Sequence, residues 1–267
     1  MKKPHEPQYS TLACELAGAV RTITLNRPDR RNAISSDMIE DLLAALANAE
    51  ADHAVRVVIL TGSGKAFCSG MDLEMLQSVT DQTPDENLGD SRQLARLFQR
   101  VYAFPKPVIT AVNGAAIAGG CGLATFSDIT LAVPEAKFGY TEVRIGFVPA
   151  IVSTFLLRQV GEKHARDLLL TGRIIGAEEA ARMGLVNEIV APEALMPRAR
   201  ELAALLMQNS PASLRATKQL LNEHGRAELD SQIEAAVRQN ASIRTTADFR
   251  EGVASFLEKR KPVWGRK

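Results

Sequence analysis

Two glycine-containing stretches have the residue types and the spacing needed for chemistry on an oxygen atom. In Val108 to Asp128, an aliphatic run breaks at Asn113-Gly114, reaches Gly119-Gly120 and continues with a helical pattern. Glycines between a strand and a helix present free backbone N–H groups at the positive end of the helix dipole. The second stretch, Lys65 to Leu73 (KAFCSGMDL), repeats this arrangement. Two N–H groups directed at one point can stabilise an oxygen that becomes anionic during a reaction.

A single Gly-Gly pair is also typical of an ordinary strand-to-helix turn, so the argument depends on the elements that position both stretches. β-branched and aliphatic runs predict strands at Val20 to Leu25, Val55 to Leu60, Val108 to Val112, Asp128 to Val133, Lys137 to Gly139 and Val186 to Val190. Amphipathic patterns predict helices from Ser36 to about Glu50, after Met71, and over Ser91 to Ala103, Ile151 to Val160, His164 to Leu170 and Ala177 to Met183. The polar stretch Thr80 to Asp90 predicts a mobile surface loop.

The alternation of strands and helices predicts an α/β core over residues 1–191. From Pro192 onward the strand patterns stop, and amphipathic helices are expected at 193–208, 210–223, 227–243 and 246–259. We therefore expect a second unit at 192–267, which serves either as a lid on the core or as an assembly module.

Composition excludes several classes of protein. A net charge of +1 gives no general reason to expect nucleic acid or an anionic membrane as a partner. Three cysteines without paired spacing fit a reducing compartment. The start MKKPHEPQYS has no apolar segment typical of a secretory signal, so a cytoplasmic location is expected. The histidines lie outside the two stretches, so neither a metal site nor a Ser-His-Asp triad is predicted. Cys121 is interpreted as a buried small residue.

Further motifs resemble a known family in their order along the chain. LNRPDRRNA, KAFCSGMDL, PVITAVNGAAIAGGCGLATFSD and AKFGYTEVRIGFVP are similar to motifs of the crotonase family of enoyl-CoA hydratases and isomerases. LLTGRIIGAEEAARMGLVNEIV and FREGVASFLEKRKPVW extend the resemblance to about residues 10–263. The resemblance implies a spiral of ββα turns, a helical C-terminal trimerisation module and acyl-CoA thioester substrates. It implies no cofactor, since coenzyme A is part of the substrate.

The resemblance also implies roles for individual residues. The backbone N–H groups of Met71 and Gly119 would form an oxyanion hole for the thioester carbonyl, and Glu142 in GYTEV would be the acid-base residue. Residues expected along the substrate or its CoA are Arg30, Arg31, Lys65, Ser69, Asp72, Leu73, Glu74, Gly120, Phe256 and Lys259. Solvated surface charge is an equally good interpretation of each of Arg30, Arg31 and Lys65.

The chain departs from the family's hydratases at two places. They carry a second glutamate three residues after the oxyanion-hole glycine, where this chain has Gly122. Glycine there should leave space in the pocket and supply no carboxylate. The family usually has glycines after Pro149, whereas Ala150, Ile151 and Val152 follow it here. An aliphatic wall should raise the pKa of Glu142 toward neutrality by desolvation, which suits a general base.

These departures favour isomerase-type chemistry with Glu142 as the single proton-transfer base, because moving a proton along an enolate requires only one carboxylate. One alternative is an enoyl-CoA hydratase, for example one for a branched short acyl group, that works without the second glutamate. Another is an acyl-CoA-binding protein without catalysis. A homotrimer or a dimer of trimers is expected, with Phe256 and Lys259 closing the CoA site, in some relatives from a neighbouring subunit.

Overall fold

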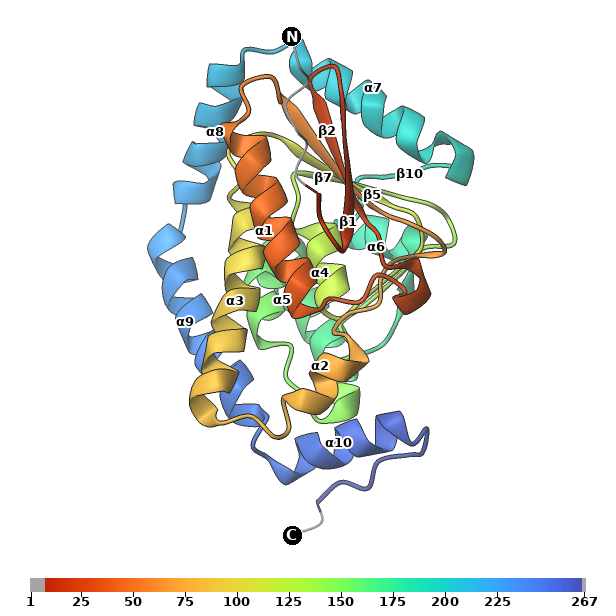
Figure 1. Cartoon of the computed structure of the whole chain (residues 1–267), viewed down its shortest axis with the longest axis vertical. Coiled ribbons are helices and arrows are strands. Elements are labelled where there is room, and N and C mark those ends of the chain that lie inside the picture. The colour runs from red at the N-terminus through yellow and green to blue at the C-terminus, as the bar shows by residue number, and fades with distance from the viewer. Residues whose placement is uncertain (1–7, 266–267) are drawn as a thin grey trace.

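The computed structural model describes residues 8–265, so most of the N-terminal segment discussed above lies outside the described residues. The chain forms two sheets that share a spiral of ββα turns, as expected (Figure 1). The strands are β1 Leu12–Ala17, β2 Val20–Leu25, β3 Val57–Gly62, β4 Ala66–Cys68, β5 Val108–Val112, β6 Ala115–Ile117, β7 Ile129–Ala132, β8 Lys137–Gly139, β9 Ile175–Gly176 and β10 Glu188–Ile189.

Helices fill the intervals and the C-terminal region. The α-helices are α1 Ser36–Ala51, α2 Leu73–Ser78, α3 Pro84–Tyr102, α4 Gly119–Thr125, α5 Ala150–Thr171, α6 Ala177–Met183, α7 Leu195–Met207, α8 Pro211–Glu223, α9 Arg226–Ile243 and α10 Ala247–Leu257. Short 3-10 turns occur at η1 Pro28–Arg30, η2 Glu142–Ile145 and η3 Pro192–Ala194.

The larger sheet has the strand order β1-β2-β3-β5-β7-β10 and is parallel except for the β1–β2 hairpin. The aliphatic strands β3 and β5 are buried on both faces, as their continuous apolar sequences predict. Helix α7 packs against β3, β5 and β7, and its fully buried Ala199 and Ala203 let the helix axis approach the sheet closely.

The smaller sheet has the order β4-β6-β8-β9. The strand predicted at Lys137 to Gly139 is confirmed as β8, whereas β4, β6 and β9 were not expected because they are only two or three residues long. Each turn of the spiral sends one strand to the larger sheet and the next to the smaller one: β3 then β4, β5 then β6, β7 then β8. Because consecutive turns pair in parallel, the segments that follow β4, β6 and β8 all leave from the same edge. The residues Met71, Gly119 and Glu142 follow these three strands.

Several sequence-based boundaries were wrong. The stretch Thr80 to Asp90 is not a loop, since α3 begins at Pro84 with a capping box in which Thr83 accepts from the Glu86 N–H and Glu86 accepts from the Thr83 N–H. The pattern T-P-D-E is a recognised helix start that the polar composition concealed. Helix α1 begins at Ser36 as predicted, with Ser35 as its N-cap. The two helices expected on either side of residue 161 form α5, which is kinked at Gly161.

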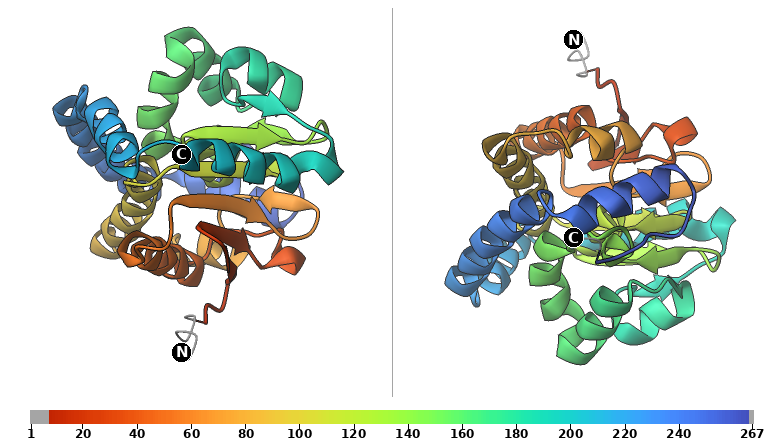
Figure 2. Two further views of the ribbon diagram at one scale, coloured as in Figure 1. Left: turned by 90° about the horizontal axis from the view of Figure 1, so that it is seen from above. Right: turned by 90° about the horizontal axis from the view of Figure 1, so that it is seen from below.

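The expected C-terminal helices are present as α7 to α10, and they spread over the core of the same chain. Helix α9 packs against α3 and α5, and α10 packs against η2. Figures 1 and 2 show α10 crossing the end of the molecule at which the C-terminus lies. Helix α8 has no buried residue and carries the exposed side chains of Leu220 and Leu221. Whether residues 192–267 also join subunits stays a prediction.

The short helix α4 is positioned by close backbone packing against β4. A Cβ atom at Gly120 would lie 2.4 Å from the Cys68 carbonyl oxygen and 2.8 Å from its Sγ atom, so this position has no room for a side chain. All residues of α4 after Gly119 are buried. The glycine at position 120 is therefore required by the contact between the two elements, independently of any chemistry.

We expect Gly120→Ala to destabilise the protein by several kcal/mol, because the added methyl group would force β4 and α4 apart in a close-packed region. Thermal and urea denaturation would measure the change. Gly89→Ala provides a matched control, since an added Cβ at this exposed site in α3 meets no atom within 4 Å. The control should gain about 0.5–1 kcal/mol from higher helix propensity. Equal effects of both substitutions would contradict the role given to the Gly120 contact.

Candidate active site

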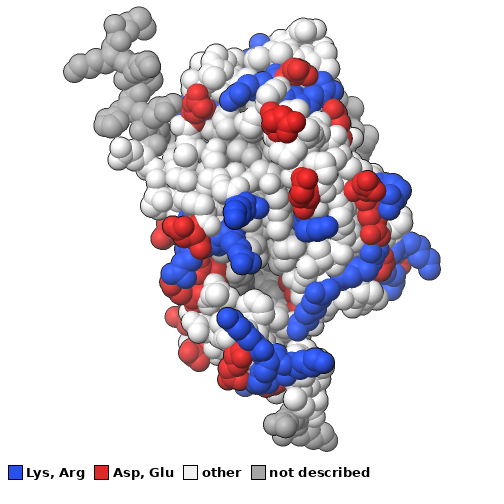
Figure 3. All heavy atoms as spheres, turned by 90° about the vertical axis from the view of Figure 1, so that its right-hand side faces the viewer, with Lys and Arg blue, Asp and Glu red and all other residues white. Residues whose placement is uncertain are grey.

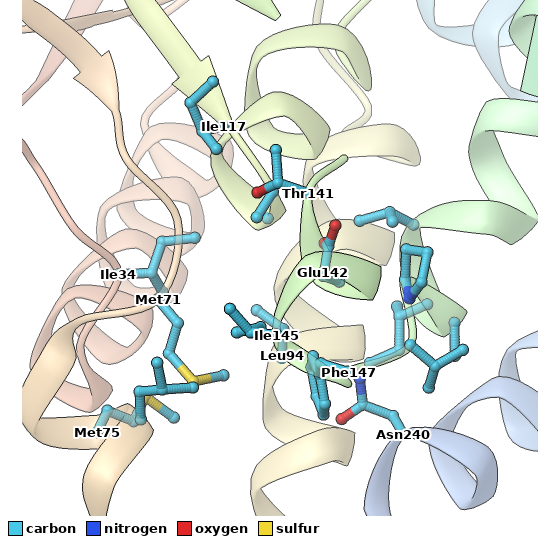
Figure 4. Close-up of a pocket in the computed structure, with 18 of the residues that line it drawn as sticks. Ile34, Met71, Met75, Leu94, Ile117, Thr141, Glu142, Ile145, Phe147 and Asn240 are labelled. Atoms are coloured by element: carbon cyan, nitrogen blue, oxygen red, sulfur yellow. The ribbon is translucent and has the colours of Figure 1, made fainter. Parts of the chain in front are cut away.

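One cavity brings together the residues that the two glycine-containing stretches supply. Ser69 and Met71 line it after β4, Ala118 and Gly119 after β6, and Glu142 after β8. The cavity has a volume of about 200 Å³, and most of its wall is aliphatic or aromatic (Figure 4). The three residues predicted to carry the chemistry therefore share one enclosed, largely apolar space.

One buried asparagine side chain fixes the part of the chain that leads into β4 and on to Met71. Asn32 is fully buried, and its amide donates to the carbonyl oxygens of Ser63 and Ala66 while accepting from the Arg27 N–H. These hydrogen bonds connect the segment Arg30 to Ala33 to the loop between β3 and β4. A parallel bridge between Ile34 and Met71 then fixes the chain at the cavity.

The backbone N–H groups of Met71 and Gly119 are available to a ligand. In the bridge, Ile34 donates to the Gly70 carbonyl and Asp72 donates to the Ile34 carbonyl, which leaves the intervening N–H of Met71 unused. Gly119 is the first residue of α4, where no intrahelical acceptor exists for the N–H. Among the described residues, no hydrogen-bond acceptor is found for either group. Ala118 precedes with φ of +51°, an uncommon conformation that starts α4 abruptly.

Glu142 lies at the start of η2 with 8% of its surface exposed. Burial raises its pKa from 4.5 to about 7, and a hydrogen bond from its own backbone N–H opposes this change. Its Oε2 atom is buried and has no hydrogen-bond partner among the described residues. Thr141 is the residue before η2, and its side chain does not cap the turn. The carboxyl group is thus poised to exchange a proton near neutral pH.

The aliphatic wall expected after Pro149 is present. Ala150, Ile151 and Val152 are buried in the first turn of α5, and all three line the cavity with Glu142. The predicted upward shift of the Glu142 pKa by desolvation is confirmed in direction.

The expectation that Gly122 leaves space in the pocket was wrong. A Cβ atom at position 122 would lie 2.9 Å from Cε2 of Phe126 and 3.1 Å from Cγ1 of Val152. Val152 lines the cavity, whereas Gly122 does not. The volume that a glutamate would occupy is filled by these two apolar side chains, so Gly122→Glu alone would require both neighbours to move.

Several residues expected near coenzyme A lie outside the cavity. Asp72 caps α2 by accepting from the Glu74 N–H, and its Oδ2 atom is 2.8 Å from Nη1 of Arg27. Arg30 and Glu74 form an exposed ion pair with each other at 2.9 Å. Arg31, Lys65, Leu73 and Lys259 are exposed, and Gly120 is buried against Cys68.

Phe256 lines the cavity from α10 of the same chain, and about half of its surface is exposed. Helix α10 packs closely on η2, since a Cβ atom at Gly252 would lie 2.1 Å from the Ile145 carbonyl oxygen. This close packing positions Phe256 at the cavity. Lys259 lies just beyond α10 with φ of +55°.

The sequence did not identify other residues of the cavity wall. Ile34, Leu94, Phe98, Phe147 and Asn240 come from four different segments and line the same space. Leu94, Phe98 and Asn240 occupy positions in the amphipathic patterns of α3 and α9 that are indistinguishable from other inward-facing positions. Only the packing of α9 against α3 and α5 brings Asn240 to the cavity.

Other chemistries have no support in the described chain. No group of three or more His, Cys, Asp or Glu side chains that could hold a metal ion occurs within residues 8–265. Cys121 is fully buried, and burial raises its pKa to about 12, which agrees with the prediction of a buried small residue. Among these residues, no helix has the length and apolar character required to cross a bilayer.

We expect Glu142→Gln to gain stability relative to the parent protein as pH rises. Because burial raises the Glu142 pKa above its unfolded value, the folded state binds the proton more tightly, and the parent loses stability between pH 4.5 and about 7. The difference in unfolding free energy should grow by on the order of 3 kcal/mol from pH 4.5 to pH 8. Urea denaturation at several pH values would measure it. Glu74→Gln, at an exposed carboxylate, should show no such trend; parallel profiles for all three proteins would refute the buried-acid interpretation.

Comparison with known proteins gives a consistent result. The profile of the family described as enoyl-CoA hydratase/isomerase matches residues 15–267. A putative enoyl-CoA hydratase of Thermus thermophilus is 49% identical over 92% of this chain and 97% of its own length. A 1,2-epoxyphenylacetyl-CoA isomerase of Escherichia coli is 36% identical over 91% of this chain and 94% of its own.

Solved structures agree with the sequence relatives. An enoyl-CoA hydratase/isomerase from Xanthobacter autotrophicus superposes with a TM-score of 0.87 at 32% identity, covering 95% of this chain and 98% of its own. An enoyl-CoA hydratase from Mycobacterium avium gives a TM-score of 0.86 at 32% identity, covering 97% and 100%. The family resemblance drawn from the motifs is thereby confirmed: the chain belongs to the enoyl-CoA hydratase/isomerase, or crotonase, family of acyl-CoA enzymes.

Proposed function

We propose that the protein moves protons on acyl-CoA thioesters with Glu142 as its single base, and that enoyl-CoA isomerisation is favoured over hydration. The observation that carries the proposal is the composition of the cavity. Of the described residues that line it, Glu142 is the one acidic residue, and the place of a second carboxylate is filled by Phe126 and Val152.

The Met71 and Gly119 N–H groups would bind the thioester carbonyl oxygen. Both belong to the cavity wall, and neither is used within the protein. Loss of one such donor typically slows a reaction by a hundredfold to a thousandfold, about 3–4 kcal/mol, because the donors are fixed before charge develops. The surrounding apolar wall excludes water and would strengthen both bonds.

In the proposed reaction, Glu142 removes a proton from a carbon of the enoyl group. The C–H bond breaks, its electron pair forms a dienolate, and negative charge moves to the thioester oxygen. The protonated Glu142 then returns the proton to a different carbon, and the double bond changes position. A pKa of about 7 makes both transfers accessible near neutral pH. No second acid is required at any step.

Hydration remains the alternative for the same site. One relative, from Syntrophomonas wolfei, carries the name crotonyl-CoA hydratase and is 35% identical. In this chain Glu142 would have to activate a water molecule without help from a second carboxylate among the described residues of the cavity wall. A third possibility, acyl-CoA binding without catalysis, requires that Glu142 never exchange a proton with the ligand.

Coenzyme A would approach from the surface beside the cavity. Arg30, Arg31, Lys65 and Lys259 are exposed cations available to its phosphates, with Arg30 first having to exchange its ion pair with Glu74. Figure 3 shows one face on which lysine and arginine side chains lie at the upper end and across the lower half, interspersed with aspartate and glutamate. Ser69, Leu73 and Phe256 would contact the acyl or pantetheine part.

The exposed apolar side chains support assembly through the C-terminal helices. Leu205, Leu220 and Leu221 are each more than half exposed in the single chain. We expect a trimer or a pair of trimers, because these leucines lose contact with water when copies associate. Light scattering at micromolar concentration would give the mass. A monomer would contradict the assembly, and Leu221→Glu should weaken a true interface while Glu223→Gln, on the same helix, should not.

We expect Glu142→Gln to lower turnover by about a hundredfold or more while CoA thioesters still bind. The first assay is exchange of the protons on the carbon next to the thioester carbonyl for deuterium in heavy water. Isomerisation of 3-enoyl-CoA and hydration of 2-enoyl-CoA are measured beside it. The parent rate should rise with pH through about 7, as Glu142 becomes ionised. Exchange that is absent in the parent would favour a binding protein. Efficient hydration of crotonyl-CoA by the parent would favour the hydratase, and full activity of the variant would assign the base elsewhere.

A further inference from the structure

A buried polar cluster lies behind the apolar wall of the cavity. It consists of Asn87 and Ser91 from α3, Asn240 from α9 and Arg244 directly after α9, and we call it the Arg244 cluster. The four residues are 0–3% exposed, although helices α3 and α9 otherwise pack through apolar side chains. Nη1 of Arg244 donates to Oδ1 of Asn87 at 3.0 Å, and Nη2 donates to Oδ1 of Asn240 at 3.1 Å. Burying such polar groups is costly unless they are hydrogen-bonded to one another.

The cluster fixes the orientation of the Asn240 amide. A guanidinium can only donate hydrogen bonds, so the Asn240 atom that faces Arg244 must be the oxygen. The Ser91 hydroxyl also lies 2.8 Å from this oxygen. The amide nitrogen, Nδ2, is therefore directed away from both groups and cannot exchange places with Oδ1 without losing these contacts.

The Asn240 Nδ2 group has no acceptor in the described chain, and it is not among the fully buried atoms that lack a partner. Asn240 lines the cavity (Figure 4), where it is drawn below Phe147 and at the opposite end from Ile117. The nearby side chains of Phe147 and Leu94 offer no hydrogen-bond acceptor. A donor of fixed direction thus faces an otherwise apolar part of the cavity.

We propose that Asn240 is a specificity-determining residue that selects acyl groups with an oxygen acceptor at the end distal to the thioester. An apolar acyl end would cover the Nδ2 group and leave its N–H donors without a partner. A site with a buried donor discriminates strongly against a ligand that lacks the matching acceptor. The inference rests on the proposed position of the thioester carbonyl at Met71 and Gly119, which directs the acyl chain into this cavity.

Two acceptor types fit this donor, a neutral hydroxyl and a carboxylate. Arg244 supplies positive charge behind Asn240; burial lowers its pKa to about 10, so it stays protonated at neutral pH. Its nearest carboxylate, Asp90, is 3.7 Å away and partly exposed, and Glu142 carries the acidic group within the cavity. Both acceptor types therefore belong in the test.

The test measures binding of saturated thioesters, which do not react, so its outcome is independent of Glu142 chemistry. Calorimetry would compare pentanoyl-CoA with 5-hydroxypentanoyl-CoA and glutaryl-CoA, which replace the terminal methyl group by a hydroxymethyl group or a carboxylate. Butanoyl- with succinyl-CoA and hexanoyl- with adipyl-CoA would vary the reach. We expect at least one acceptor-ended thioester to bind about tenfold more tightly than its methyl-ended counterpart.

Asn240→Asp keeps an oxygen for Arg244 and Ser91 but turns the group facing the cavity from a donor into an acceptor. For a carboxylate-ended thioester the preference should reverse, because the two carboxylates repel each other. A hydroxyl can donate to the new carboxylate, so its test uses Asn240→Leu, which removes the donor and should abolish the preference. Asn87→Asp is the matched control, because Asn87 also accepts from Arg244 but does not line the cavity. This variant should leave the preference for acceptor-ended thioesters unaltered. The proposal is overturned if methyl-ended thioesters bind at least as well at every chain length, if Asn240→Asp keeps a parental preference for a carboxylate, or if Asn240→Leu keeps a parental preference for a hydroxyl. Failure of the proposed function would instead appear as absent proton exchange, whatever the binding preference.

Discussion

The site depends on the close contact between the start of α4 and the end of β4. Gly120 lies so near the Cys68 carbonyl that no side chain fits between them. This contact joins two neighbouring turns of the spiral just before the chain reaches Met71 and just after it passes Gly119. The N–H groups of Met71 and Gly119, which are 48 positions apart in the sequence, thereby reach the same cavity. A side chain at position 120 would separate the elements and with them the two donors.

The second constraint is the exclusion of water from the part of the cavity around Glu142. Ala150, Ile151 and Val152 displace water, and the carboxyl group responds with a higher pKa. The same burial that makes the group a suitable base at neutral pH lowers the stability of the folded protein once the group is ionised. Val152 and Phe126 also occupy the volume beside Gly122. Absence of the second carboxylate and desolvation of the first are thus two consequences of one packing arrangement.

The C-terminal helices contribute to the same cavity from a distance in sequence. Phe256 reaches it because α10 packs closely on η2 through Gly252, and Asn240 reaches it because α9 lies against α3 and α5. Helices α3, α5, α9 and α10 each supply side chains to the cavity wall. In the proposed function these side chains would contact the acyl group and contribute to the choice of acyl chain.

The sequence by itself determined the α/β class, most helices and long strands, and the identity of the residues around the two glycine-containing stretches. These features are local or carried by motifs, so periodicity and spacing suffice to predict them. Of the smaller sheet only β8 was predicted, because the two or three residues of β4, β6 and β9 carry no measurable period. The start of α3 was missed because polar residues at a capping box resemble a loop. The environment of each site residue was decided only by the tertiary structure. Gly122 faces apolar atoms instead of open space, and Asp72 is held by Arg27 at the start of α2. Asn240 presents its amide nitrogen to the cavity because Arg244 can only donate hydrogen bonds. Each of these outcomes depends on contacts between segments far apart in the chain, and no local pattern specifies which segments will meet.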